Sequence, residues 1–416
     1  MFVDVECNGV NVNTIALADD GSVWAWGQDY GLTPAEVEIS DVTAISAGNV
    51  HVLALRSDGT VWVWGKNYQG QFGDGTTENS NTPKRVEGLD NIVAISAGDT
   101  HSIALKSDGT VWAWGRNRVG QLGDGTFTDR YVPGQVLGLP MIKWIGGHGT
   151  VAIAIDGTVW TWGKTLLNVS NNCKPVDGSD PQFISLCRPT PYMVPGLKNI
   201  LSIDSDYEHT TFVKEDGTVW NWGYNGWGLF GDGTSELGNR VYVTDPVQVG
   251  GIDDVKKVVT SSHSTLALKN DGAVWAWGTN DMGLQGTGKP GNIVPSPVKI
   301  DSLSDIVTIG MGEGGAAAIG SDGSVWAWGN NYMGPIEQGK TCLSPNKAIG
   351  PDRAAASLTP DNTSVNGTSN ATPTGGVPQT GSTEGSGNDG NLILMGVLAV
   401  TVAICVTMVV LAKRKK

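Results

Sequence analysis

Short apolar runs alternate with polar turns along most of this chain, and the alternation returns about every fifty residues. Within residues 92–115, apolar runs at 92–96, 102–105 and 111–114 are separated by polar segments. Runs of this length bounded by Gly, Asp and Ser are typical of β-strands. The pattern therefore predicts three short strands in each unit.

The turn before the third run indicates how these strands pair. Asp108-Gly109 is a two-residue turn whose left-handed geometry suits a β-hairpin, so the second and third strands are expected to be antiparallel. Alternation with period two places Trp112 and Trp114 on the same face of the third strand. One face of each unit is therefore strongly apolar.

A fourth run follows the next loop and contains proline in five of the units. These prolines are Pro83, Pro133, Pro191, Pro246 and Pro297. Proline lacks the N–H that a central strand needs, so the fourth strand is predicted to be the outer edge of its sheet.

The phrase Asp-Gly-Thr/Ser/Ala-Val-Trp-x-Trp-Gly occurs seven times and contains 14 of the 16 tryptophans. Its first tryptophans are Trp24, Trp62, Trp112, Trp160, Trp220, Trp275 and Trp326. Four antiparallel strands repeated near fifty residues are typical of a propeller blade. We predict an all-β fold, a seven-bladed β-propeller, over residues 1–350.

The order Gly-x-x-His, Ala-Leu, Asp-Gly-x-Val-x-x-Trp-Gly and Asn-x-x-Gly-Gln-Leu-Gly-x-Gly resembles the repeat of the regulator of chromosome condensation family. Residues 95–126 match this order almost throughout, as do residues 45–76. The resemblance covers about residues 3–346 and implies a seven-bladed propeller. The first, fourth and seventh units depart from it after the second tryptophan, the seventh with Gly334-Pro335.

The C-terminal segment has a different composition. Residues 351–390 are rich in Thr, Ser, Asn, Gly and Pro, which is typical of a flexible spacer. Residues 391–412 are almost wholly apolar and long enough to cross a bilayer as a helix. The basic tail 413–416 follows, and the positive-inside rule places it in the cytoplasm and the propeller outside.

The spacer contains Val377-Pro378-Gln379-Thr380-Gly381. Together with the apolar span and basic tail, this pentapeptide resembles the Leu-Pro-x-Thr-Gly sorting signal of Gram-positive surface proteins, with Val377 in place of leucine. The resemblance implies that sortase cleaves the Thr380–Gly381 bond and joins Thr380 to the peptidoglycan precursor. Two alternatives remain, a chance match in a biased linker and a plain single-pass membrane anchor.

Export needs a basic segment followed by an apolar one. Residues 1–5 instead begin directly in a predicted strand. We expect that the start of the chain is truncated; the alternative is that the C-terminal span itself directs insertion.

The chain has 27 basic and 41 acidic residues, a net charge of −14. An acidic surface repels phosphate backbones, so nucleic acid is not an expected partner.

Four of the five cysteines suggest two bridges in an oxidising compartment. Cys173 and Cys187 bracket a stretch of the fourth unit and could staple that loop, while Cys7 and Cys342 lie near the two ends of the propeller and could latch it. Sequence alone leaves both pairings open.

The five histidines occupy one repeat position, and the Gly-Asp-Gly-Thr segments are expected to be turns. The histidines are His51, His101, His148, His209 and His263. A metal-binding ring of histidines is conceivable, but a structural role joining strands is the favoured interpretation. We expect no catalytic group, metal or cofactor, and therefore no enzyme. Trp227, outside the repeat phrase, is either a partner anchor or rim packing.

These features predict a non-enzymatic, cell-surface-anchored propeller that binds a protein or glycan ligand. The longest loops, at residues 164–190 and 233–245, are candidate contact segments. An alternative, implied by resemblance to secreted bacterial members of the family, is a wall-held inhibitor of a secreted enzyme such as a β-lactamase. A guanine-nucleotide exchange factor, as in nuclear members, is disfavoured by the predicted location.

Overall fold

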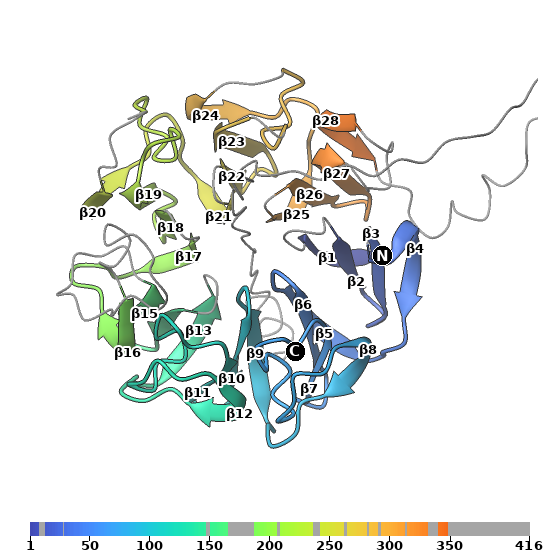
Figure 1. The fold of residues 1–416 in the computed structure, drawn as a ribbon. Coiled ribbons are helices and arrows are strands. Elements are labelled where there is room, and N and C mark those ends of the chain that lie inside the picture. Colours follow the sequence, from blue (N-terminus) through green and yellow to red (C-terminus); the bar gives the residue numbers. More distant parts are fainter. Residues whose placement is uncertain are drawn as a thin grey trace, which may run out of the picture.

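The computed structural model describes the ring-shaped part of the chain. The described residues are 1–347 except 8–12, 28, 147–149, 165–186, 206–208, 236–241, 262–263, 281–282, 290–292, 313 and 332–339. They form seven four-stranded antiparallel sheets, arranged as blades around a central axis (Figure 1). The predicted all-β seven-bladed propeller is confirmed. The pentapeptide 377–381 and the predicted span 391–412 lie outside the described residues, and among the residues described no helix is long and apolar enough to cross a membrane.

Each blade is built from four consecutive strands. In blades 1 to 4 the strands are β1 (Phe2–Cys7), β2 (Thr14–Ala18), β3 (Val23–Gly27), β4 (Gly31–Val37), β5 (Val42–Ala47), β6 (His51–Arg56), β7 (Val61–Gly65), β8 (Ser80–Arg85), β9 (Ile92–Ala97), β10 (His101–Lys106), β11 (Val111–Gly115), β12 (Arg130–Gln135), β13 (Ile142–Gly146), β14 (Val151–Ala154), β15 (Val159–Lys164) and β16 (Cys187–Met193). In blades 5 to 7 they are β17 (Ile200–Ser205), β18 (His209–Lys214), β19 (Val219–Tyr224), β20 (Tyr242–Gln248), β21 (Val255–Ser261), β22 (Ser264–Lys269), β23 (Val274–Gly278), β24 (Val294–Lys299), β25 (Ile306–Met311), β26 (Gly315–Gly320), β27 (Val325–Asn331) and β28 (Lys340–Lys347).

The hairpin turn predicted from Asp-Gly is present in blade 3 and sets the register of β10 and β11. Gly109 has a φ of 83°, which glycine adopts without strain. The backbone N–H of Thr110 and its hydroxyl both donate to Asp108 Oδ1, at 2.9 and 2.7 Å. The turn is thereby closed, and Leu105 pairs with Val111 directly above it.

The proline-bearing strands are the outermost strands of their sheets, as predicted. Pro83, for example, lies in β8, which pairs only with β7 in the described sheet. The same holds in blades 1 and 7, whose outer strands carry Pro34 and Pro345. The missing N–H thus faces away from the ladder in every blade.

The apolar core is divided into seven clusters, each lying between two neighbouring blades. Between blades 2 and 3, Trp114 packs with Phe72, Leu89 and Ile95. The second tryptophan of the phrase is fully buried, as Trp114 is at 0% exposure, whereas the first, Trp112, is half-buried. Each blade therefore covers the apolar face of its neighbour, and no blade has a core of its own.

The ring closes by packing, because each blade uses one continuous stretch of chain. In the closing cluster, Phe2 and Val5 of β1 meet Ala317 and Ile319 of β26. The strand β1 contacts both β25 and β26 of blade 7. The first and last blades are therefore held together by side chains rather than by a shared strand.

The possible Cys7–Cys342 bridge, which the sequence left open, is not formed, because Cys7 is a buried free thiol. Cys7 lies in the innermost strand β1, whereas Cys342 pairs with Gly329 in the outermost strand β28. The strand β28 lies two strands outward from β26, roughly 10 Å at the usual strand spacing, which exceeds the roughly 7 Å that a disulfide spans between Cα atoms. Burial raises the pKa of the Cys7 thiol to about 12, so it is unreactive at neutral pH.

Candidate interaction surface

The propeller has two edges with different loops. In each blade the Asp-Gly turns join the second and third strands at one edge, which we call the hairpin edge. The long connections between the third and fourth strands lie at the opposite edge, which we call the loop edge. In blade 3, for example, His101 pairs with Gly115 at the loop edge, and residues 116–129 follow there.

The loop of blade 2, residues 66–79, is held from within by an asparagine. Asn67 Oδ1 accepts a hydrogen bond from the Phe72 N–H at 2.9 Å, while the Asn67 N–H donates to Asn79 Oδ1 at 2.7 Å. Phe72 is fully buried beneath the loop. The Asn-x-x-Gly-Gln pattern therefore keeps the loop in one conformation, and its exposed side chains are presented from a rigid base.

The same loop is attached to the next blade. The Gly75 N–H donates to the carbonyl of Tyr131 in β12 at 2.8 Å. Equivalent glycines, Gly125 and Gly233, donate to Pro189 and Pro295 in the same way. The Gly-Asp-Gly-Thr segments are thus turns, as predicted, and they lock adjacent blades together.

The recurring histidine joins blades through side chains. His51 Nε2 lies 2.9 Å from Ser102 Oγ of blade 3, and Ser102 in turn donates its hydroxyl to the Gln71 carbonyl at 2.8 Å. Because that hydroxyl hydrogen is used, His51 Nε2 carries the proton and donates to Ser102. The Trp114 indole N–H donates to the same Gln71 carbonyl at 2.8 Å.

A structural role was the favoured interpretation of the histidines, and the contact found for His51 is to a side chain of the next blade rather than to backbone. His209 makes the equivalent contact, with Nε2 at 3.2 Å from Thr265 Oγ1. His148 and His263 lie outside the described residues. Among the residues described, no three metal-ligating side chains come together.

The aspartates of the hairpin turns accept hydrogen bonds within those turns. The hydroxyl and then the backbone N–H of the residue two positions on lower the pKa of the carboxyl at Asp58 and Asp108, which therefore remain ionised at neutral pH. These carboxylates cap turns and do not exchange protons near neutrality.

Buried acidic side chains line the inner strands, which sequence reasoning missed. Burial raises the pKa of Asp4 to about 6, and the positive charge of Lys257 partly offsets this. Lys257 donates to Thr308 Oγ1 at 2.8 Å, so three successive blades contribute to this inner group. Asp204 accepts a 2.8 Å hydrogen bond from the Thr260 N–H. The sequence of β1 contained a signal for this, because Asp4 lies between two valines in an otherwise apolar strand start.

Large apolar side chains are exposed where the loops of blades 2 and 3 meet. We call Tyr68, Phe127, Tyr131 and Val132 the blade 2–3 patch; their exposed fractions are 53%, 37%, 40% and 51%. Tyr131 covers Gly70, where an added Cβ would overlap its ring, and Val132 lies beside Gly75. The patch is therefore built on the locked loop described above.

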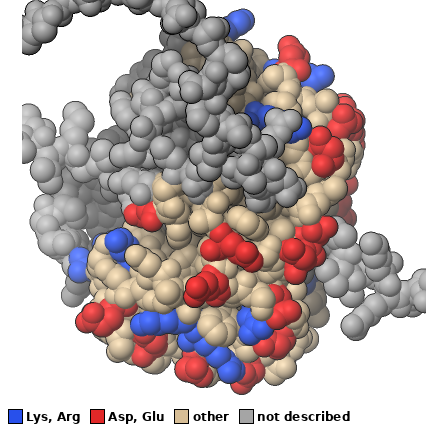
Figure 2. Space-filling view, turned by 90° about the vertical axis from the view of Figure 1, so that its right-hand side faces the viewer, with Lys and Arg blue, Asp and Glu red and all other residues tan. Residues whose placement is uncertain are grey.

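Basic residues occur in the loops of blades 2 and 3. Arg118 of blade 3 is exposed at the position that Tyr68 occupies in blade 2, and Lys66 and Arg116 are half-buried at equivalent positions one step after the third strand. The chain carries 41 acidic and 27 basic residues, and the rim of blades 7, 1 and 2 shows both kinds interspersed (Figure 2). The loops of blades 2 and 3 therefore carry both aromatic and cationic side chains.

The other predicted site residues are placed as follows. Trp227 is half-buried in the loop of blade 5, and its role as a partner anchor stays a prediction. Cys187 is disulfide-bonded, while Cys173 lies outside the described residues, as do positions 165–186 and 236–241 of the two longest loops.

A closed ring of seven four-stranded blades held by tryptophan and glycine contacts between neighbours defines a β-propeller built from sequence repeats. Two models of the regulator of chromosome condensation (RCC1) repeat match the chain, one at residues 58–105, 108–155 and 271–319, the other at 42–71, 92–121 and 255–284. The chain therefore carries RCC1 repeats, as the sequence pattern indicated.

Relatives match over limited segments. Protein pim1 of Schizosaccharomyces pombe is 28% identical over 158 residues, which cover 34% of this chain and 29% of that protein. Protein RCC1 of Candida albicans is 33% identical over 153 residues, 32% of each chain. The chain thus matches about a third or less of the length of these relatives.

Solved structures share the fold over a larger part. Yeast RCC1 (Prp20), in a crystal structure with Kap60, has a TM-score of 0.63 at 22% identity, over 77% of this chain and 79% of that one. Human WBSCR16 has a TM-score of 0.62 at 22% identity, over 74% and 84%. At such identities the likeness shows the propeller fold.

Proposed function

We propose that this chain is a non-enzymatic protein-binding propeller displayed at the cell surface. The observation that carries the proposal is the blade 2–3 patch, in which Tyr68 and Tyr131 stand exposed on locked loops. Tyrosine is enriched among the residues that dominate the energy of protein interfaces. The patch therefore has the composition of a contact surface.

The rigidity of the loops adds to this argument. Asn67 and Gly75 fix the loop of blade 2 before any partner arrives. A partner would then meet side chains that are already placed, and less conformational entropy is lost on binding. A propeller of similar fold, Prp20p of Saccharomyces cerevisiae, is described by its binding to Gsp1p and histones.

The C-terminal segment supports display at the surface of a Gram-positive cell. Its parts are the sorting-like pentapeptide 377–381, the apolar span 391–412 and the basic tail 413–416. Under this proposal sortase and peptidoglycan are partners through Thr380. The spacer 351–390 would hold the propeller away from the wall.

The patch is tested by substitution with a control on the opposite edge. A photo-reactive residue at position 68 of the full-length chain captures the partner, and Tyr68→Ala/Tyr131→Ala is expected to weaken its affinity at least tenfold. The control is Met141→Ala/Ile155→Ala, which removes two apolar side chains of similar exposure, 56% and 60%, from the hairpin edge. Equal affinities of the two double variants, measured by surface plasmon resonance, would refute the patch.

The anchor is tested by Thr380→Ala in the producing cell. The unsubstituted chain is expected in the peptidoglycan fraction with its new C-terminus at Thr380, and the variant in the membrane or medium fraction. Fractionation followed by mass spectrometry of the C-terminal peptide decides the point. Wild-type chain that keeps residues 381–416 in the membrane would replace wall attachment with a plain membrane anchor.

A further inference from the structure

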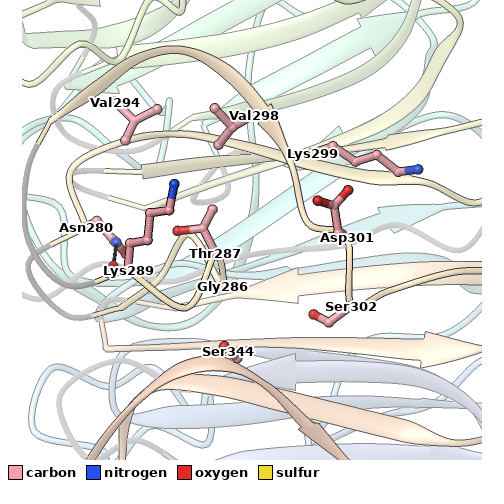
Figure 3. A pocket seen from close by; sticks show the side chains of 10 residues that line it. All are labelled: Asn280, Gly286, Thr287, Lys289, Val294, Val298, Lys299, Asp301, Ser302 and Ser344. Atoms are coloured by element: carbon pink, nitrogen blue, oxygen red, sulfur yellow. Dashed lines mark hydrogen bonds between the residues drawn. The ribbon is translucent and has the colours of Figure 1, made fainter.

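A groove of about 620 Å³ lies at the rim between blades 6 and 7, away from the blade 2–3 patch. It is lined by the loop that carries Gly286, Thr287 and Lys289, by Val294 and Val298 of β24, and by Ser344 of β28 (Figure 3). A volume of this size is within the range of small-molecule sites. Because the propeller is a repeat, the equivalent place in blades 2 and 3 offers a comparison.

In blades 2 and 3 a long cation and an aspartate fill the equivalent position. In blade 2, Lys84 lies 4.0 Å from Asp74 and extends over the ring of Phe72. In blade 3 the guanidinium of Arg130 lies 3.2 Å from Asp124. These ion pairs join the loop to the outer strand in both blades.

Blade 6 has lost both partners of that pair. Register with the third strand places Val298 where blade 2 has Lys84, and Val294 where blade 3 has Arg130. The aspartate position is taken by Thr287. Two short apolar side chains and a hydroxyl leave the groove open.

The aspartate that blade 6 lacks accepts hydrogen bonds within the turn in blades 2, 3 and 5. Asp74 Oδ1 accepts hydrogen bonds from the N–H and the hydroxyl of Thr76, at 2.9 and 2.7 Å. Blades 3 and 5 repeat this arrangement around Asp124 and Asp232. In blade 6 the residue corresponding to Thr76 is Lys289, so the loop has exchanged an internal acid for a cation.

The remaining lining groups favour an anion that also carries hydroxyls. Lys289 and Thr287 extend toward the wall formed by Val294 and Val298 (Figure 3). Asp301, Ser302 and Ser344 line the opposite part, and Lys299 lies beside them. Among the residues that the structure describes, the lining includes two lysines against one acid and contains no aromatic ring on which a neutral sugar would stack.

We propose that this groove binds a small hydroxylated carboxylate of the hexuronate type. The ligand carboxylate takes the place that Asp74 and Asp124 occupy in their blades, with Lys289 Nζ and Thr287 Oγ1 as donors. Ligand hydroxyls meet Ser302, Ser344 and Asp301. The site is additional to the protein-binding role and uses no residue of the blade 2–3 patch. The two proposals are therefore tested independently.

The test is isothermal titration of the full-length chain with glucuronate, glucose and inorganic phosphate. Glucuronate is expected to bind, and Thr287→Asp/Lys289→Thr is expected to weaken binding about tenfold or more, because the charge-assisted hydrogen bonds are replaced by an internal carboxylate. This double variant recreates the Gly-Asp-Gly-Thr turn of blades 2, 3 and 5, so folding should be preserved. The control is Lys198→Asp, which makes the same change in charge at an exposed remote site.

Four results would overturn the proposal. These are no heat from glucuronate at about 10 mM, the range of very weak binding, unchanged affinity in the double variant, an equal loss in Lys198→Asp, or equal binding of glucose or phosphate. Circular dichroism of both variants confirms that any loss occurs in a folded protein.

Discussion

Replacing Trp114 with alanine is expected to lower the free energy of unfolding by about 3–5 kcal/mol, the usual cost of removing a large buried aromatic side chain. Trp114 is fully buried between blades 2 and 3, where it packs against Phe72 and Ile95. Its indole N–H donates to the Gln71 carbonyl at 2.8 Å. The substitution therefore creates a cavity and also removes a bond that joins two blades.

The variant Trp114→Phe separates these two contributions. Trp114→Phe keeps most of the apolar volume but removes the indole donor, and about 1–2 kcal/mol of loss is expected. The Gln71 carbonyl still accepts the Ser102 hydroxyl in that variant, which limits the effect. Urea unfolding of the full-length chain, followed by far-ultraviolet circular dichroism, measures all of these differences.

The matched control is Trp112→Ala in the same strand. Trp112 is half-buried, and its indole donates to Thr110 of its own turn at 3.2 Å. Its removal should cost no more than about 1–2 kcal/mol, because Trp112 lies only at the margin of the cluster between blades 2 and 3, so less area is buried, and its indole N–H bonds within its own blade. Equal losses for Trp112→Ala and Trp114→Ala would contradict the assignment of blade cohesion to the second tryptophan.

The difference between these two tryptophans shows what the sequence could predict. Their alternation placed both on one face of the third strand, and the fold confirms that placement. Strand order also followed from local rules, since a proline such as Pro133 fits an outer strand. Local patterns sufficed because every blade is one continuous segment of chain.

Contacts between blades were beyond local patterns. The network of His51, Ser102, Gln71 and Trp114 joins residues up to about sixty positions apart, and no single repeat contains it. The groove near Thr287 was missed for a related reason. It depends on which side chains are absent from blade 6 relative to blades 2 and 3, and this becomes visible only once the register of the strands is known.

The possible bridge between Cys7 and Cys342 is excluded by the radial positions of their strands. Cys7 and Cys342 are near the two ends of the ring, which do meet, but one lies in an innermost strand and the other in an outermost strand. Order along the chain gives the neighbour of a blade, whereas the position of the strand within the blade gives the distance from the axis. Both are needed to predict a bridge.

Acid is expected to destabilise the propeller through His51. Burial lowers the pKa of His51 to about 3, against about 6.5 in the unfolded chain. Between these two pKa values the His51 imidazole is protonated in the unfolded state and neutral in the folded state. The stability contributed by the neutral imidazole is complete above about pH 6.5 and is lost as the pH falls toward 3, by about 3 kcal/mol between pH 7 and pH 4.

The variant His51→Gln is expected to abolish this component. Its side-chain amide can still donate to Ser102, so the loss at pH 7 should be modest, about 1 kcal/mol. Below pH 6 the variant loses stability more slowly than the wild type, and the two stabilities converge or cross. The comparison is made by urea unfolding at several pH values, which cancels contributions common to both proteins. One such contribution comes from Asp4, whose pKa burial raises to about 6. Its effect has the opposite sign to that of His51, because the stability that it contributes falls as the pH rises from about 4 to 6.

The variant Ser102→Ala tests whether burial or hydrogen bonding causes the lowered pKa of His51. It removes the acceptor of the His51 Nε2 proton and costs stability at every pH, but it leaves the imidazole buried. Since burial alone lowers the pKa of His51, the acid-dependent loss of the wild type should persist in this variant. If His51→Gln and the wild type instead lost stability in parallel between pH 7 and pH 4, the imidazole would titrate freely in the folded state. The contact between His51 and Ser102 would then open without unfolding, and the joint between blades 2 and 3 would be looser than its buried hydrogen bonds indicate.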